Sequence, residues 1–198
     1  LKWGDIDVLI MPDGRYKFLA DKDDAKKLEE WIRNGGRVVA LESAVAQLSK
    51  QDWSNVKSKN NAEEEAGKKD PYASLQSFDK RERDALSNLT SGAIFKTDVD
   101  NTHPLMFGYP KYYYTLKMDN NVYEFIKEGG WNAGVLKKEN QLAGYVGSRL
   151  NSKLKDGLLF GVQDLGAGSV TYLTDNVMFR NFWENGKMLL ANAVFLVG

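Results

Sequence analysis

The sequence predicts an α/β domain whose sheet is partly parallel. Two short apolar runs lie at residues 7–11 and 37–41, and an amphipathic segment lies between them. A strand, a helix and a strand within about 35 residues indicate a right-handed βαβ unit with parallel strands. The second half of the chain instead carries short β-prone runs separated by Gly, Asn and Asp. We therefore expect a mixed sheet, parallel at the start and antiparallel later.

The predicted βαβ unit consists of a strand, an amphipathic helix and a second strand. Residues 7–11, DVLIM, form an apolar run that ends in a Pro-Asp-Gly turn, as a buried strand should. The helix has an acidic start at residues 21–24, a Gly-Gly stop, and apolar residues at helical spacing, namely Ala25, Leu28, Trp31 and Ile32. The β-branched run RVVAL at 37–41 follows at once and predicts the second strand.

The second half is expected to be mainly antiparallel. A short helix is predicted over residues 79–89, and a Gly-Ala-Gly turn at 166–168 predicts a hairpin. A final apolar helix is expected from about Phe179. The predicted strands are residues 93–97, 112–116, 134–136, 143–146, 158–162 and 169–173. We interpret residues 1–198 as a single domain.

Composition excludes several classes of function. The chain of 198 residues has 27 basic and 27 acidic side chains, no Cys and one His. A net charge of zero argues against a nucleic-acid partner, and the missing cysteines exclude disulfides and thiolate chemistry. No apolar run approaches the roughly 20 residues of a membrane span. Residues 50–70 are charged without periodicity and predict a mobile insertion. Because the chain begins with Leu1, we expect it to be a piece of a longer polypeptide.

Candidate site residues follow the two parallel strands. Ligands in such sheets bind beyond the carboxyl ends of the strands, which points to Asp13, Glu42 and Ser43. Ser43 is either a helix cap or a nucleophile, and His103 is either a general base or a loop histidine. Acidic residues here match no calcium-loop spacing, so we expect no metal site. The Tyr112–Tyr114 run offers either a stacking surface for sugars or packing.

The order of these elements resembles the class I glutamine amidotransferase-like fold. In that family a strand enters a tight turn that carries the nucleophile, the nucleophile elbow. Aligning VALESAVAQL (residues 39–48) with this elbow places Ser43 at the nucleophile position and Gln47 at a family Gln. Leu41 and Val45 then replace two glycines of the family. The family's Cys is absent, so glutamine hydrolysis is not expected.

A closer resemblance covers most of the chain. Residues 91–96, 100–109, 130–132 and 175–183 are similar to the amidotransferase-like C-terminal domain of secreted zinc carboxypeptidases of Bacteroidetes-type bacteria. The resemblance implies a flavodoxin-like sheet with antiparallel C-terminal strands and a C-terminal helix. It also implies a secreted or periplasmic location. Zinc would be bound only by a separate N-terminal peptidase domain, the expected partner, and no cofactor is expected in this chain.

This resemblance further implies that the domain's first strand, helix and strand precede Leu1. The strand at 7–11 would then be an unpaired edge, which we expect a second copy of the chain to cover. The function implied is that of a non-catalytic accessory domain, structural or binding a substrate or partner. Two alternatives stay open: a degenerate hydrolase using Ser43 and His103, and a carbohydrate-binding module using Tyr112–Tyr114.

Overall fold

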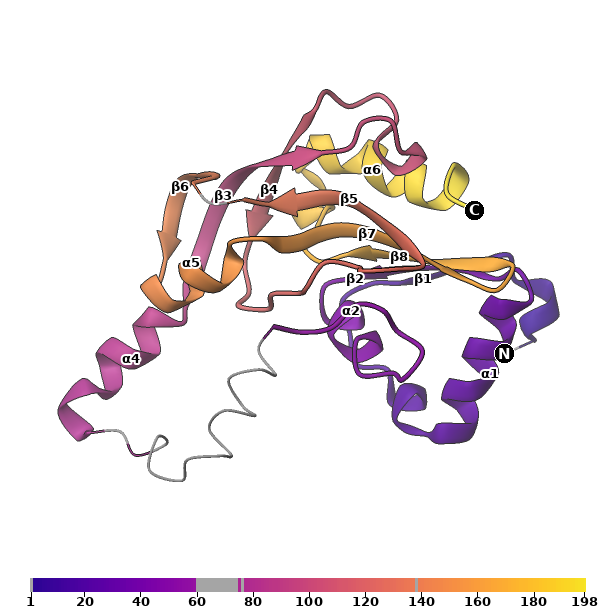
Figure 1. Cartoon of the computed structure of the whole chain (residues 1–198), viewed down its shortest axis with the longest axis horizontal. Coiled ribbons are helices and arrows are strands. Elements are labelled where there is room, and N and C mark those ends of the chain that lie inside the picture. The colour runs from indigo at the N-terminus through magenta and orange to yellow at the C-terminus, as the bar shows by residue number, and fades with distance from the viewer. Residues whose placement is uncertain (1, 60–74, 76, 138) are drawn as a thin grey trace.

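A computed structural model describes residues 2–59, 75, 77–137 and 139–198. It contains one curled eight-stranded sheet in the order β1-β2-β8-β7-β5-β3-β4, with β6 paired to β3 (Figure 1). The strands are β1 (Val8–Met11), β2 (Arg37–Leu41), β3 (Thr90–Val99), β4 (Tyr112–Lys117), β5 (Gly130–Leu136), β6 (Gln141–Val146), β7 (Gly157–Leu165) and β8 (Gly168–Leu173).

The α-helices are α1 (Lys22–Arg33), α2 (Ser43–Leu48), α4 (Arg81–Ser87), α5 (Ser148–Leu154) and α6 (Glu184–Phe195). Short 3-10 turns are η1 (Trp3–Asp5), η2 (Lys17–Ala20), η4 (Phe78–Lys80), η5 (Pro104–Met106) and η6 (Phe179–Asn181). The mixed α/β class predicted from the sequence is confirmed.

The opening βαβ unit forms as predicted. Asp21 caps α1, because its carboxylate accepts the backbone N–H groups of Asp23 and Asp24, each at 3.0 Å. Strand β1 then pairs in parallel with β2, from Val8 opposite Arg37 onward. The acidic start and the Gly-Gly stop therefore set the length of α1 and return the chain beside β1.

The late hairpin joins this parallel unit. Strands β7 and β8 are antiparallel and turn at Gly166, whose φ of +68° suits glycine. Strand β8 also pairs in parallel with β2. A strand from the end of the chain thus lies in the middle of the sheet, and the carboxyl ends of β1, β2 and β8 lie along the same edge.

Helices cover both faces of the parallel part (Figure 1). Successive side chains of β2 alternate, with Val38 and Ala40 in the core beneath α1 and α2, and Val39 and Leu41 in the core beneath α6. Leu28, Ile32 and Leu48 belong to the first core, and Leu189 and Ala193 to the second. This alternation explains why residues 37–41 are apolar throughout.

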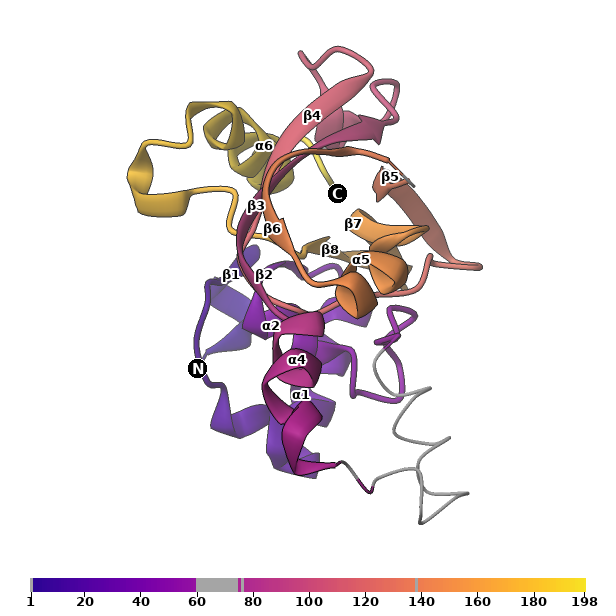
Figure 2. The same ribbon diagram turned by 90° about the vertical axis from the view of Figure 1, so that its left-hand side faces the viewer.

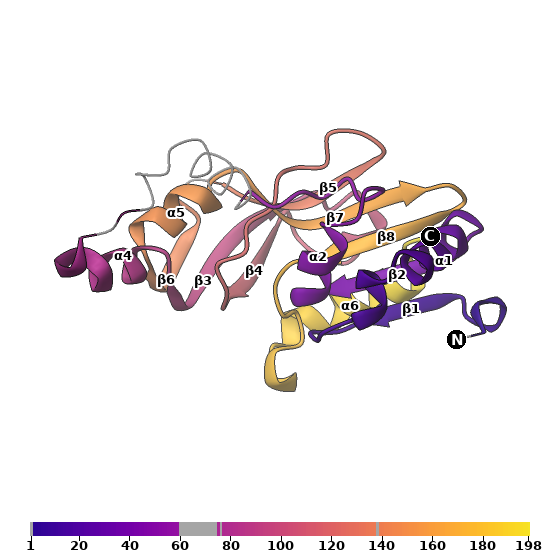
Figure 3. The ribbon, with the colours of Figure 1, turned by 90° about the horizontal axis from the view of Figure 1, so that it is seen from below.

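The antiparallel strands curl away from the parallel part (Figure 2). Long strand β3 pairs with β4, β5 and β6, and α4 and α5 lie at its far end (Figure 3). A third, smaller core there includes Phe95, Leu136 and Leu150. The curl brings the end of β4 toward the carboxyl ends of the parallel strands.

One expectation needs correction. The final helix begins at Glu184 rather than near Phe179, because Arg180 and Asn181 adopt positive φ angles that no α-helix contains. The mobility of the insertion predicted at residues 50–70 stays a prediction. In its described part Val56 is fully buried, and Lys59 N–H donates to the Val122 carbonyl at 2.8 Å. Residues 60–70 lie outside the described part.

Strand β1 is an edge of the sheet, with β2 as its one neighbour among the described strands. Ile10 on it is 45% exposed. The unpaired edge expected from the sequence is present, and a second copy covering it stays a prediction.

Within the described residues, no helix combines the length and the apolar character that crossing a bilayer requires.

Candidate functional site

The turn from β2 into α2 has the geometry of a nucleophile elbow, with Glu42 at its apex. Strand β2 ends at Leu41 and α2 begins at Ser43, so a single residue makes the turn. Glu42 has φ 49° and ψ −115°, a strained conformation for a residue with a side chain. Its backbone N–H donates to the Leu173 carbonyl at 3.0 Å, which fixes the apex beside the carboxyl end of β8.

This placement corrects the sequence alignment by one residue. A strained elbow needs small residues two positions before and after its apex. Counting from Glu42, these positions are Ala40 and Ala44, and both are fully buried. Counted from Ser43, the same two positions are Leu41 and Val45, whose side chains are too large for such a turn. The pattern Ala-x-Glu-x-Ala was visible in the sequence and is the signal that identifies the apex.

Ser43 instead ties α2 to the loop after β1. Its hydroxyl donates a short hydrogen bond to the Asp13 carboxylate and accepts from Gly14 N–H at 2.9 Å. Gln47, one turn later, donates to the Gly14 carbonyl at 2.7 Å and accepts from Tyr16 N–H at 2.8 Å. Asp13 and Ser43 are therefore brought together as the sequence suggested, but in a contact that fastens a loop.

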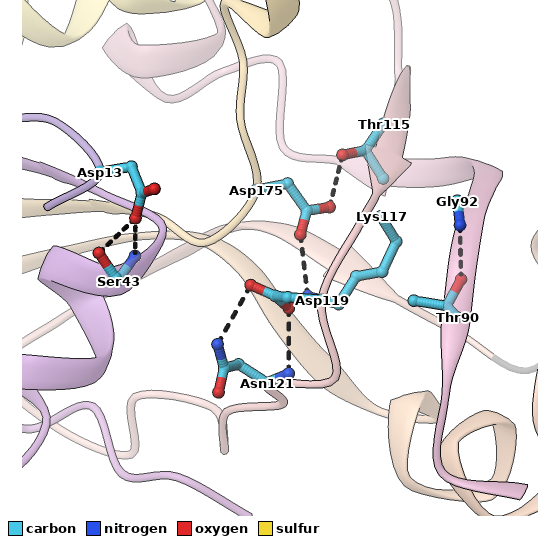
Figure 4. A network of polar contacts seen from close by, with 9 residues as sticks. All are labelled: Asp13, Ser43, Thr90, Gly92, Thr115, Lys117, Asp119, Asn121 and Asp175. Carbon is cyan, nitrogen blue, oxygen red and sulfur yellow. Dashed lines mark hydrogen bonds and ion pairs between the residues drawn. The ribbon is translucent and has the colours of Figure 1, made fainter. Parts of the chain in front are cut away.

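A buried ion pair that the sequence analysis missed lies beside the elbow (Figure 4). Lys117, at the end of β4, is 1% exposed, and its Nζ lies 3.0 Å from the Asp175 carboxylate. The same ammonium group contacts Asp119, and Thr115 donates to Asp175 at 2.6 Å. Asp119 in turn accepts from the backbone and the side chain of Asn121. Each buried charge here is paired and hydrogen-bonded.

The charges around Glu42 shift its titration toward neutral pH. Burial is the largest cause, the carboxylates of Asp13, Asp119 and Asp175 act in the same direction, and Lys117 opposes them; together they raise the pKa of Glu42 to about 7. For Lys117, burial alone would lower the pKa, but the Asp175 and Asp119 carboxylates outweigh it and the pKa is raised. Glu42 thus carries a partial charge near neutrality, whereas Lys117 stays an ammonium ion.

His103 lies at the other end of the parallel strands. It precedes η5, and its Nδ1 accepts the N–H of Leu105 at 3.1 Å. It lines a pocket together with Ser169 at the start of β8. Ser169 pairs with Arg37 at the start of β2, whereas Ser43 follows the end of that strand. Four residue steps separate the two ends, about 13 Å.

The Ser43–His103 pair considered from the sequence is therefore not formed. His103 takes the loop-histidine role instead, as the cap of η5.

Two other possible sites are also not assembled. Tyr112 and Tyr114 are each 38% exposed, but their rings are inclined at 68°, so they present no flat stacking surface, and Tyr113 between them is buried. Among the described residues, no group of three or more His, Asp or Glu side chains is arranged to hold a metal ion.

The chain resembles several solved structures at low identity. It shares 13% identity and a TM-score of 0.47 with a ThuA-like protein from Bacteroides uniformis ATCC 8492, covering 95% of this chain and 67% of that one. With a cytoplasmic protein from Salmonella typhimurium it shares 11% identity and a TM-score of 0.49, and the match covers 96% of this chain and 71% of that one. With an exo-β-1,4-mannosidase from Opitutaceae bacterium strain TAV5 it shares 11% identity and a TM-score of 0.42, and the match covers 98% of this chain and 25% of that one.

No family model and no curated protein matches the sequence. Identity this low says nothing about side-chain roles, so function has to be argued from the residues of this chain.

Proposed function

We propose that this chain is a non-catalytic, amidotransferase-like accessory domain of a secreted zinc carboxypeptidase. The observation that carries the proposal is the elbow, whose apex holds Glu42 where a hydrolase of this type needs Ser or Cys. The parent enzyme and the secreted location rest on the resemblance of residues 91–96 and 100–109 to that family. The domain would stabilise the peptidase domain or help it bind its peptide substrate.

The surroundings of the elbow support a structural or binding role. The Ser43 hydroxyl is already used, since it donates to Asp13 and accepts from Gly14. A serine nucleophile needs a general base and a group that orients that base. The described residues contain one histidine, and it lies at the opposite ends of the strands. Acyl transfer through Ser43 therefore lacks a histidine base among the described residues.

The first test separates binding from hydrolysis. We expect the chain and its Ser43→Ala and His103→Ala variants to show the same background rate on p-nitrophenyl esters and on small amides. A rate in the wild type that falls more than about tenfold in either variant would support the hydrolase instead. Glu42→Gln serves as a third variant, because loss of activity there alone would identify a carboxylate-dependent enzyme.

The second test concerns the parent enzyme. We expect removal of this domain from the full-length carboxypeptidase to lower its melting temperature or to raise KM for peptides. The zinc content should stay unchanged, because the metal is expected only in the peptidase domain. Equal stability and equal kinetics of the two proteins would remove the accessory role.

A further inference from the structure

A second site lies at the amino ends of the parallel strands, on the face that α6 covers. Trp131 of β5 is opposite Val162 of β7, and Asp164 two residues later is opposite Ser169 of β8. Cross-strand partners and residues two apart share one face of a sheet, so all four side chains project to the same side. These four side chains form the floor of a pocket.

Two chain segments complete the walls of this pocket. His103, with its neighbours Asp100 and Thr102, forms one side, and the residues after α6, Leu196 and Val197, form another. The cavity measures about 380 Å³, within the range of about 300 to 1,000 Å³ that is usual for small-molecule sites. The Trp131 ring lies 6.3 Å from the His103 ring and is 59% exposed, an unusual degree for a tryptophan.

The charges lining the pocket are of one sign. Asp100 and Asp164 contribute carboxylates, and no lysine or arginine is among the lining residues. Within the described part of the chain, neither carboxylate has an ion-pair partner; Asp100 accepts from Thr102 in its own turn. Arg37, which pairs in register with Ser169, donates its Nη1 to the Val197 carbonyl at 2.9 Å. That hydrogen bond leaves the positive charge of Arg37 in place beside Val197 and Gly198, whereas the described lining residues themselves carry two carboxylates and no cation.

His103 does not offset this charge. Burial lowers its pKa, against the opposing effect of Asp100 and Asp164, so the ring is neutral at pH 7. Because Nδ1 accepts the Leu105 N–H, the ring proton is on Nε2. The imidazole can donate one neutral hydrogen bond but supplies no positive charge.

We propose that this pocket binds an organic cation, an alkylammonium or guanidinium group, over the face of Trp131. An exposed indole and nearby carboxylates attract a cation through its charge and through the quadrupole of the ring. An anion would meet two carboxylates, and a neutral polyol would leave both of them uncompensated. The site is separate from the elbow, so the proposal does not depend on the accessory role.

The experiment compares cationic probes with a neutral probe that has nearly the shape of arginine. Nα-acetyl-arginine amide and Nα-acetyl-lysine amide are titrated into the chain against the neutral Nα-acetyl-citrulline amide, using calorimetry and the indole N–H resonance of Trp131. We expect the cationic probes to shift this resonance and to bind about tenfold more tightly than the neutral one. Putrescine in a parallel titration distinguishes a free amine from a peptide side chain, according to which binds more tightly.

Variants test the assigned contacts. Trp131→Ala should weaken binding of the arginine probe about tenfold, and Asp164→Asn should weaken it severalfold and reduce its salt dependence. Phe182→Ala is the matched control, because Phe182 is also 59% exposed and should not affect binding. If Trp131→Ala does not fold, the proposal is tested by the affinity of Trp131→Phe and by the shift of the Trp131 indole resonance in the wild-type chain. Equal binding of citrulline, or an unshifted Trp131 resonance at saturating probe, would overturn the proposal.

Discussion

The two ends of the parallel strands differ in how their polar groups are satisfied. At the carboxyl ends, Ser43 bonds Asp13, and Lys117 lies between Asp175 and Asp119. At the amino ends, Asp100 and Asp164 line a cavity without ion pairs to the described basic residues. Polar groups that satisfy one another stabilise the fold, whereas groups left facing a cavity are available to a ligand.

This difference changes where a ligand is to be sought. The general rule for open α/β sheets directs attention to the carboxyl ends, and Glu42 lies there with a strained backbone. In this chain, however, a cavity lined by carboxylates that are unpaired within the described residues lies at the opposite ends.

The buried ion pair should be the most costly feature to break. Lys117→Met leaves Asp175 buried without its partner and should lower the free energy of unfolding by about 3 to 5 kcal/mol. Urea denaturation measures this. The Lys117→Met/Asp175→Leu double variant should recover most of the loss, and Asp164→Asn at the other end should cost less than about 0.5 kcal/mol. Equal costs for Lys117→Met and Asp164→Asn would contradict the contrast between the two ends.

Glu42 should make stability depend on pH. Its folded pKa of about 7 lies above its ordinary value, so the folded state holds a proton that the unfolded state has already lost. The stabilising contribution is complete at low pH and disappears as pH rises toward and through 7. Relative to Glu42→Gln, the wild type should lose about 1 to 2 kcal/mol between pH 4.5 and 8, allowing for partial solvent screening.

Denaturation at several pH values, together with an NMR titration of the Glu42 carboxyl, measures this effect. Glu128→Gln, at an exposed carboxylate, is the matched control and should keep the wild-type pH profile. A Glu42 carboxyl that titrates near 4.5 would show that neither burial nor the surrounding carboxylates raise its pKa.

The strain at the elbow should be measurable as stability. Glu42→Gly removes the side chain from a backbone with φ 49° and should raise the unfolding free energy by about 1 kcal/mol relative to Glu42→Ala. Comparison with the alanine variant isolates the backbone term, because both variants lack the carboxylate. A glycine variant no more stable than the alanine variant would mean that the turn is unstrained.

The edge strand should affect association more than stability. We expect the chain to form a dimer through β1, and Ile10→Lys should give a monomer by light scattering with less than about 0.5 kcal/mol change in stability. Leu142→Lys, at an exposed position on β6, is the control and should leave the dimer intact. A monomeric wild type would remove the prediction.

Local features were predictable to a useful extent. The acidic start of α1 at residues 21–24, its Gly-Gly stop and the hairpin at Gly166 all depend on residues close together in sequence, and all are present in the structure. The elbow apex was placed one residue late because the alignment used Ser43 as a chemical substitute for Cys. Backbone sterics, through Ala40 and Ala44, would have located it at Glu42.

The sequence by itself determined where most of the strands and helices lie, since hydrophobic periodicity and turn chemistry are local properties. Helix α5 (Ser148–Leu154) was not predicted, and α6 begins later than expected. Only the tertiary structure decided which polar residues meet. Lys117 and Asp175 are 58 residues apart and come together because β8 inserts beside β2 while the sheet curls β4 toward it. The same packing separates Ser43 from His103 and places Trp131 beside Asp164. Such contacts depend on strand order and on curvature, which no local pattern encodes.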